Sequence, residues 1–205
     1  MLSSSDEIFF IFDLETNGLP CSSNFGYKFV NNWPKIVQIA WGLYNSQGHN
    51  LVFRNYILKP VDFTISKEST KIHGISSNFA KKNGIKMHNI LKIIQNDLKK
   101  SSFIVAHNLN FDRNTLLSEF TRIDRSDLIH LFETKKQICT LKETIDFCRI
   151  NGSPNPYSLY KWPKLAELYK KLFNKNIENA HNAEYDVKNL STCFFELLKR
   201  GIIRL

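Results

Sequence analysis

The stretch IFFIFDLETNGLP, residues 8–20, carries five consecutive apolar residues directly into two acids, Asp13 and Glu15. An uninterrupted apolar run is typical of a strand covered on both faces, so we predict a central strand at 8–13. Side chains two residues apart on a strand point to the same side, which brings the two carboxylates together at the strand's end. Carboxylates this close repel unless a cation lies between them. A pair of solvated turn acids is the alternative interpretation.

The rest of the chain alternates between strand and helix patterns. Further strands are expected at 35–45 and 51–60, which form a hairpin around SQGH, and at 103–108 and near 137–139. Apolar stripes or helix-forming composition predict helices at 87–98, after 108, after 139, at 164–173 and at 183–199. Gly and Pro predict a loop at 151–158. This order predicts an α/β fold with helices packed on a sheet, in one domain over residues 1–205.

The composition is that of a folded, basic protein. Hydrophobic residues make up 42% of the 205 residues, and 28 Lys+Arg against 19 Asp+Glu give a net charge of +9. Such a surface favours polyanions, nucleic acid first and an anionic membrane surface second. The N-terminal MLSSSDE lacks a secretion pattern, and no apolar run reaches the roughly 18 residues that span a bilayer. The four cysteines form no C-x-x-C pair, so we expect a soluble intracellular protein, cytoplasmic or nuclear, with free thiols.

Two further acids fall on the inward side of predicted helix starts. In VAHNLNFDRNTLLSEF, Asp112 precedes Leu116 by four residues, and in HNAEYDVKNL, Asp186 precedes Leu190 by four. An acid in a first helical turn also complements the helix dipole, which is the alternative explanation. A buried charge nevertheless needs a partner, and hard oxygen ligands suit Mg²⁺ or Mn²⁺. We therefore predict a metal site shared with the acid pair on the first strand.

The segments FDLET, VAHNLNFD and HNAEYD resemble, in order and spacing, the three exonuclease motifs of the DEDDh superfamily, which contains RNase T and the proofreading epsilon subunit of DNA polymerase III. The resemblance spans residues 8–198. This branch has a histidine five residues before the last motif acid, and His181 has that spacing from Asp186. The sister DEDDy branch has a tyrosine four residues before the acid, where this chain has Asn182. The resemblance implies an RNase H-like fold, a central mixed five-stranded sheet with helices on both faces.

The resemblance also implies a catalytic site of five residues: Asp13, Glu15, Asp112, His181 and Asp186. The four acids would hold two Mg²⁺ or Mn²⁺ ions, which stabilise the attacking and leaving oxygens of an in-line displacement at phosphorus. His181 would be the general base, a role suited to a side chain that titrates near neutral pH. The expected reaction is 3′–5′ removal of nucleoside 5′-monophosphates, with DNA favoured as substrate.

Four residues are implied contacts to the terminal nucleotide: Leu14, Thr16, His73 and Phe111. For His73, in STKIHGIS, an ordinary His-Gly turn is the alternative interpretation. The loop aromatics Phe25, Tyr27 and Phe29 fit either base stacking or loop packing. We interpret His107 as a hydrogen-bonding residue at a strand end. The histidines without a supporting pattern are expected at the surface: His49, His88 and His130.

Three alternatives stay open at this point. An RNA exonuclease of the same fold, RNase T-like or oligoribonuclease-like, would share every motif. A catalytically inactive nucleic-acid-binding module is disfavoured because all four acids and the histidine are present. A membrane-surface protein is disfavoured because no helix combines a broad apolar face with a lysine-only polar face. A polymerase or another replication or repair protein is an open partner, and the sequence does not determine the oligomeric state.

Overall fold

The computed structural model describes residues 7–153, 158–178 and 181–205. The predicted 151–158 loop lies partly outside the described residues, as does most of the N-terminal MLSSSDE segment. A mixed five-stranded sheet forms the centre, in the order β3-β2-β1-β4-β5. Its strands are β1 (Phe9–Thr16), β2 (Ile36–Tyr44), β3 (Asn50–Ile57), β4 (Phe103–Ala106) and β5 (Lys136–Cys139). β1 pairs antiparallel with β2 and parallel with β4, so it is the central strand that the sequence predicts.

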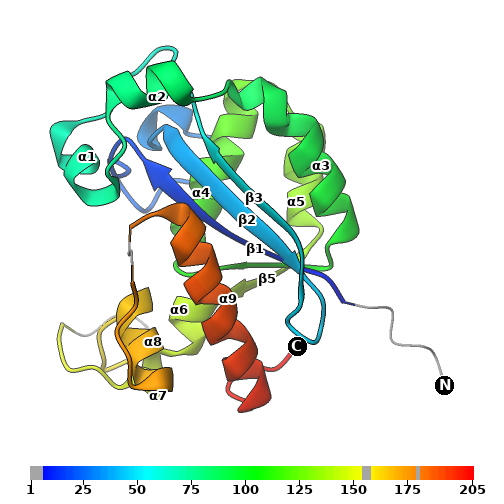
Figure 1. The fold of residues 1–205 in the computed structure, drawn as a ribbon, viewed down its shortest axis with the longest axis vertical. Coiled ribbons are helices and arrows are strands. Elements are labelled where there is room, and N and C mark those ends of the chain that lie inside the picture. The colour runs from blue at the N-terminus through cyan, green and yellow to red at the C-terminus, as the bar shows by residue number, and fades with distance from the viewer. Residues whose placement is uncertain (1–6, 154–157, 179–180) are drawn as a thin grey trace.

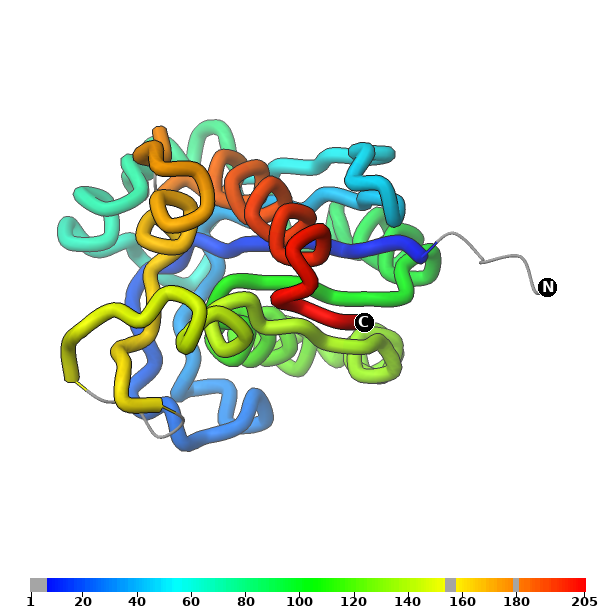
Figure 2. The backbone as a smooth tube through the Cα atoms, turned by 90° about the horizontal axis from the view of Figure 1, so that it is seen from below, coloured from blue at the N-terminus to red at the C-terminus, as the bar shows by residue number. Residues whose placement is uncertain are grey.

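The apolar run of β1 is divided between the two faces of the sheet. Phe10 and Phe12 belong to one core cluster, and Phe9 and Ile11 belong to the other. All four side chains are fully buried. Burial of each such side chain contributes about 1.5–3 kcal/mol, so packing from both faces fixes this strand. Figure 2 shows the blue β1 running through the middle of the molecule.

Helices cover both faces of the sheet, as predicted. One face carries α3 (Leu91–Lys100), α4 (Leu109–Arg122) and α5 (Ser126–Glu133). The other carries α8 (Leu165–Phe173) and α9 (Ala183–Lys199), and α9 crosses in front of the sheet in Figure 1. The shorter helices are α1 (Lys67–His73), α2 (Ser77–Asn83), α6 (Thr140–Glu143) and α7 (Ile145–Cys148). Two 3₁₀ turns, η1 (Val30–Asn32) and η2 (Met87–Ile90), complete the described elements.

Several element boundaries differ from the prediction, among them the end of β1 and the helix after β5. β1 continues to Thr16 because its pairing with β2 extends to Thr16 opposite Ile36, so Asp13 and Glu15 lie within the strand and not beyond its end. The acids are therefore held by backbone pairing on β1 itself. The helix predicted after β5 is two short helices, α6 and α7, separated at Thr144.

The four cysteines differ in how far they are buried. Cys148 and Cys193 are buried, Cys139 is half-buried and Cys21 is exposed, and all four are free thiols. Among the described residues, no helix has both the length and the apolar character that crossing a bilayer requires.

Candidate active site

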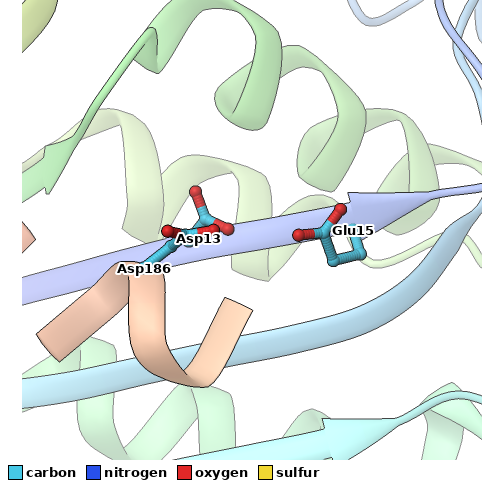
Figure 3. Close-up of side chains that lie close together, drawn as sticks. All are labelled: Asp13, Glu15 and Asp186. Atoms are coloured by element: carbon cyan, nitrogen blue, oxygen red, sulfur yellow. The ribbon is translucent and has the colours of Figure 1, made fainter. Parts of the chain in front are cut away.

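Three carboxylates meet where β1 passes the start of α9. Asp13 and Glu15 follow Phe9 and Ile11 in the two-residue alternation of the strand, so they lie on its α9 side. Asp186 lies in the first turn of α9. One oxygen of each carboxylate lies within 4.8 Å of the others (Figure 3). The structure therefore brings together three of the four acids that the sequence predicts.

Burial and mutual repulsion raise the pKa values of these carboxyl groups. Burial raises the pKa of Asp13 well above its usual range, and the charges of Asp112, Asp186 and Glu15 raise it further. The pKa of Glu15 is raised to about 8, first by burial and then by Asp186. No ion pair compensates these acids in the part of the chain that the structure describes. A divalent cation would supply the missing charge, and carboxylate oxygens are the donors that Mg²⁺ and Mn²⁺ prefer, so the site fits such an ion.

The metal-free protein should lose stability as the pH rises from 6.5 to 8. A carboxyl group with a raised folded-state pKa stabilises the fold below its unfolded pKa, and that stability is lost as the pH rises through the folded pKa. For Glu15 this window runs from 4.5 to about 8. The lowered pKa values of His107 and His73 act in the opposite direction, but only up to the ordinary histidine value of 6.5. Thermal unfolding in EDTA measures the loss, at about 1.4 kcal/mol per unit of pKa shift.

Glu15→Gln should flatten this fall in stability, because it removes one of the groups with a raised pKa. Glu143→Gln, at an exposed position on α6, is the matched control and should leave the fall unchanged. Mg²⁺ or Mn²⁺ should raise the unfolding midpoint of the unmodified protein, by more at pH 8 than at pH 6.5. A metal-free midpoint that stays level or rises between these pH values would contradict the prediction.

Asp112 lies beside the three-acid cluster and is not part of it. Its side chain is buried in the first turn of α4. Burial raises its pKa well above the usual range, and the charge of Glu15 adds to the rise. Hydrogen bonds from the backbone N–H groups of Asp112 and Leu14 oppose the rise, and the second of these ties the start of α4 to β1. A share of Asp112 in metal binding, direct or through water, stays a prediction.

His181 lines the same cavity as Asp13 and Asp186. Its φ of 65° is a left-handed conformation that residues other than glycine adopt rarely. Its backbone N–H donates to Asp186 Oδ2 at 3.0 Å, so the loop and the acid hold each other in place. The exposed side chain lines a cavity of about 600 Å³ together with Asp13 and Asp186. The predicted base and two of the predicted acids therefore share one hollow.

Gln38, on β2, holds the start of α9 and is absent from the residues that the motifs predict. Its side chain is 1% exposed. Nε2 donates to the Asn182 side-chain oxygen, and Oε1 accepts from the backbone N–H of Ala183, each at 3.3 Å. These bonds hold the first turn of α9, which contains Asp186, against β2. The signal in the sequence is a lone polar residue within the apolar run IVQIAW.

His107 is the strand-end hydrogen-bonding residue that the sequence predicts. Its Nδ1 lies 3.0 Å from Thr140 Oγ1, and its Nε2 lies 2.9 Å from the Pro163 carbonyl oxygen. Burial lowers its pKa to about 4, so the ring is neutral and Nε2–H donates to the carbonyl. This bond ties the end of β4 to the wall of the cavity at Pro163. The histidines predicted at the surface are exposed: His49, His88 and His130.

Of two predicted substrate contacts, Phe111 reaches the cavity and the Leu14 side chain does not. Phe111 lines the cavity. The Leu14 side chain is 5% exposed and packs in the core that contains α4, on the other face of β1 from Asp13. Contact between the Leu14 side chain and substrate is therefore not supported by its position, although its backbone lies beside Asp112.

The other two, Thr16 and His73, lie near the end of β1. The Thr16 hydroxyl donates to the Gly18 carbonyl at 2.6 Å. His73 is buried, and its Nδ1 accepts from the backbone N–H of Ile75 at 3.1 Å, as in a His-Gly turn. Burial lowers the pKa of His73, and a hydrogen bond with the Thr16 backbone opposes this shift. A role for either residue in binding substrate stays a prediction.

The family model RNase_T, described as an exonuclease, matches residues 10–194. The chain therefore belongs to this exonuclease family, within the DEDDh superfamily. The family depends on divalent metal, in agreement with the acid cluster.

Individual relatives differ in how much of their length the chain spans. The chain is 28% identical to the DNA polymerase III epsilon subunit of Buchnera aphidicola, over 88% of this chain and 84% of the relative. It is 27% identical to the PolC-type DNA polymerase III of Streptococcus pyogenes, over 92% of this chain but only 11% of that relative. The structure of E. coli exonuclease I with a dA16 oligonucleotide matches with a TM-score of 0.73 and 20% identity, over 95% of this chain and 41% of that one. This structural match supports the fold.

Proposed function

We propose that the chain is a 3′–5′ exonuclease that releases nucleoside 5′-monophosphates from the 3′ end of DNA. The observation that carries the proposal is the joint placement of Asp13, Asp186 and His181 around one cavity. In the proposal, residues 1–205 act as one exonuclease domain. A replicative polymerase is the proposed kind of partner, because two of the relatives are DNA polymerase III proteins.

Asp13, Glu15 and Asp186 would hold divalent metal, with Asp112 completing the site directly or through water. Two bound Mg²⁺ or Mn²⁺ ions would stabilise the negative charge that develops on the attacking and leaving oxygens. The His181 ring would accept the proton of the attacking water from the open side of the cavity. The Asp186 carboxylate would keep the His181 backbone in place through their 3.0 Å hydrogen bond.

The proposed contacts to the terminal nucleotide are the side chains of Thr16, His73 and Phe111 and the backbone of Leu14. Phe111 has the strongest support, because its ring lines the cavity that holds the acids. A base stacked on such a ring gains about 1–3 kcal/mol without regard to its identity, which suits an enzyme that removes every nucleotide in turn.

DNA is the favoured substrate because of the relatives. The epsilon subunit and the PolC-type enzyme are named as DNA polymerase III proteins, and exonuclease I is bound to a DNA oligonucleotide. The net charge of +9 favours a polyanion but does not separate DNA from RNA.

Matched DNA and RNA single strands of one sequence, labelled at the 5′ end, test substrate and direction together. With Mg²⁺ or Mn²⁺ we expect a ladder of labelled DNA fragments that shorten from the 3′ end, and slower digestion of RNA. A phosphorothioate linkage at the 3′ terminus should block digestion, whereas one at the 5′ terminus should not. Faster digestion of RNA, or release of the 5′ nucleotide first, would contradict the proposal.

A further inference from the structure

A chain of side-chain amides crosses the sheet to the start of α9. Gln38 lies opposite Glu15 in the pairing of β1 with β2. Asn55 of β3 lies opposite Ala40, and Ala40 lies opposite Asp13. Residues directly opposite each other in a sheet share a face, so both amides lie on the face that carries the acids. On this face α9 packs across β1, β2 and β3 (Figure 1).

Asn55, on the edge strand β3, joins Gln38 to the first turn of α9. Its Nδ2 donates to Glu184 Oε2 at 2.9 Å, and its Oδ1 accepts from Gln38 Nε2 at 2.9 Å. The same Gln38 amide bonds Asn182 and the backbone N–H of Ala183, as described above. The two amides therefore hold three consecutive residues at the N-terminus of α9, 182–184.

The Glu184 carboxylate sets the direction of the donors in this chain. Because a carboxylate only accepts hydrogen bonds, Asn55 must turn its NH₂ group toward Glu184 and its oxygen toward Gln38. Gln38 must then turn its NH₂ group toward Asn55, which leaves its oxygen for the Ala183 N–H. Glu184 is held in place by Lys188 at 2.6 Å. The orientation of the buried Gln38 amide is therefore fixed from the exposed edge strand.

The position of Asp186 depends on the helix turn that this chain holds. The Asn182 side chain caps α9 by accepting from the Glu184 N–H at 3.1 Å. The Asn182 carbonyl accepts from the Asp186 N–H at 2.9 Å. The Asp186 carboxylate in turn accepts from the His181 N–H. Displacement of this turn would therefore move Asp186 and the His181 loop away from the two acids on β1.

We propose that Asn55 is a positioning residue of the metal site, acting through Gln38 and Glu184 on the helix turn that carries Asp186. This inference rests on the proposed function, in which Asp186 and the β1 acids bind divalent metal. Loss of a residue that orients metal ligands typically costs about 10- to 100-fold in metal affinity. Asn55 is exposed, and substitutions at exposed positions ordinarily have small effects. A change in metal affinity would therefore report positioning.

Asn55→Ala should raise the Kd for Mn²⁺ by about 10-fold, measured from the electron paramagnetic resonance signal of free Mn²⁺. Asn50→Ala is the matched control and should leave this Kd unchanged. Asn50 is an exposed asparagine at the other end of β3, and its amide donates to the Val52 carbonyl within the strand. Because the acids stay intact, excess Mn²⁺ should largely restore hydrolysis of a DNA oligonucleotide by Asn55→Ala. A lower unfolding midpoint with an unchanged Kd would show a merely structural role and overturn the proposal.

A charged substitution at the same position tests the proposal by the sign of its effect. Asn55→Asp sets a carboxylate against Glu184, and their repulsion should displace the start of α9 and weaken Mn²⁺ binding. Added negative charge alone would instead tighten Mn²⁺ binding. Combining Asn55→Asp with Glu184→Gln exchanges the amide and the carboxylate, so the hydrogen bond forms in the opposite direction and the affinity of the unmodified protein should return.

Tighter Mn²⁺ binding by Asn55→Asp, or no recovery in the double variant, would overturn the proposal. Failure of the unmodified protein to bind Mn²⁺ would instead contradict the proposed function, on which the role of Asn55 rests.

Discussion

Replacing Asp13 with asparagine should abolish hydrolysis while making the metal-free protein more stable. The substitution keeps the size of the side chain and removes a charge that burial and three neighbouring carboxylates make costly. Loss of a metal-binding carboxylate removes several kcal/mol of transition-state stabilisation, roughly 10³-fold or more in rate. Mononucleotide release from a labelled oligonucleotide and thermal unfolding in EDTA measure the two effects.

The opposite signs of these effects make the experiment specific. A variant that merely misfolds would lose both activity and stability. Asp127→Asn on α5, an exposed acid paired with Arg125 at 2.7 Å, is the control and should change activity little. Asp186→Ala should also abolish activity. Turnover near that of the unmodified protein in either active-site variant would disprove the mechanism.

Replacing His181 should lower kcat by about 10²–10⁴-fold, the usual contribution of a general base. The backbone at this position has a φ of 65°, which asparagine tolerates better than alanine does. His181→Asn therefore removes the imidazole while favouring the loop conformation that bonds Asp186. Comparison with His181→Ala separates loss of the base from loss of the loop.

Both variants should lower kcat at every pH at which the unmodified protein is active, because both lack the imidazole that would accept the proton. Metal binding, measured by the rise in unfolding midpoint with Mn²⁺, should persist in His181→Asn since the acids are unchanged. His130→Ala on α5, an exposed histidine, is the control. An asparagine variant with an unchanged kcat would show that another group takes the proton.

The central sheet and the acid cluster follow from short-range patterns in the sequence. The apolar run of β1 predicts burial on both faces, and alternation brings Asp13 and Glu15 to one side. The same alternation puts the Leu14 side chain on the opposite side of β1, in the core. Family resemblance alone, by contrast, suggests that Leu14 contacts substrate. Period and pattern therefore predict which face a residue occupies.

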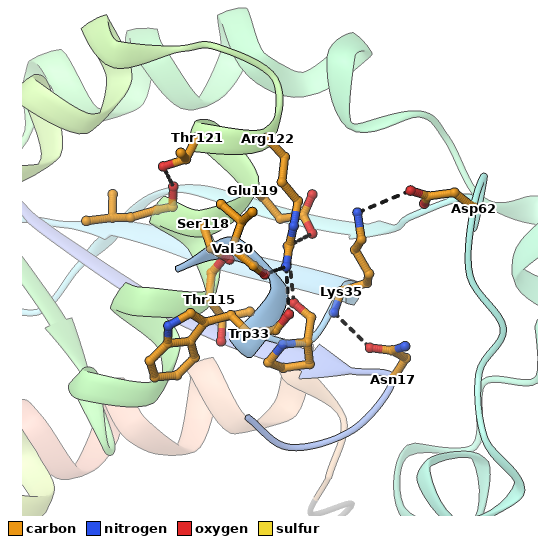
Figure 4. Close-up of polar contacts among 12 residues, drawn as sticks. Asn17, Val30, Trp33, Lys35, Asp62, Thr115, Ser118, Glu119, Thr121 and Arg122 are labelled. Carbon is orange, nitrogen blue, oxygen red and sulfur yellow. Dashed lines mark hydrogen bonds and ion pairs between the residues drawn. The ribbon is translucent and has the colours of Figure 1, made fainter. Parts of the chain in front are cut away.

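Pattern does not predict how element ends meet in space. Asp112 and Asp186 each lie in the first turn of a helix, α4 and α9. Asp112 nevertheless lies outside the 4.8 Å cluster of carboxylates, because α4 and α9 pack against opposite faces of the sheet. Gln38 acts across 145 positions of sequence on the backbone of Ala183, and no local motif marks such a bond. Likewise, the Arg122 side chain donates to the backbone carbonyl of Trp33, 89 positions earlier in the chain (Figure 4).

The division of β1 between two cores links correct folding to catalysis. A shift of β1 by one residue against β2 would turn every side chain to the other face. Asp13 and Glu15 would then face the apolar layer under α4, and Leu14 would lie where the acid cluster now is. Such a mispaired chain would be both unstable and inactive, so a stable, partly active form with the wrong register is not expected. The register of β1 that buries the core is therefore also the register that assembles the acid cluster.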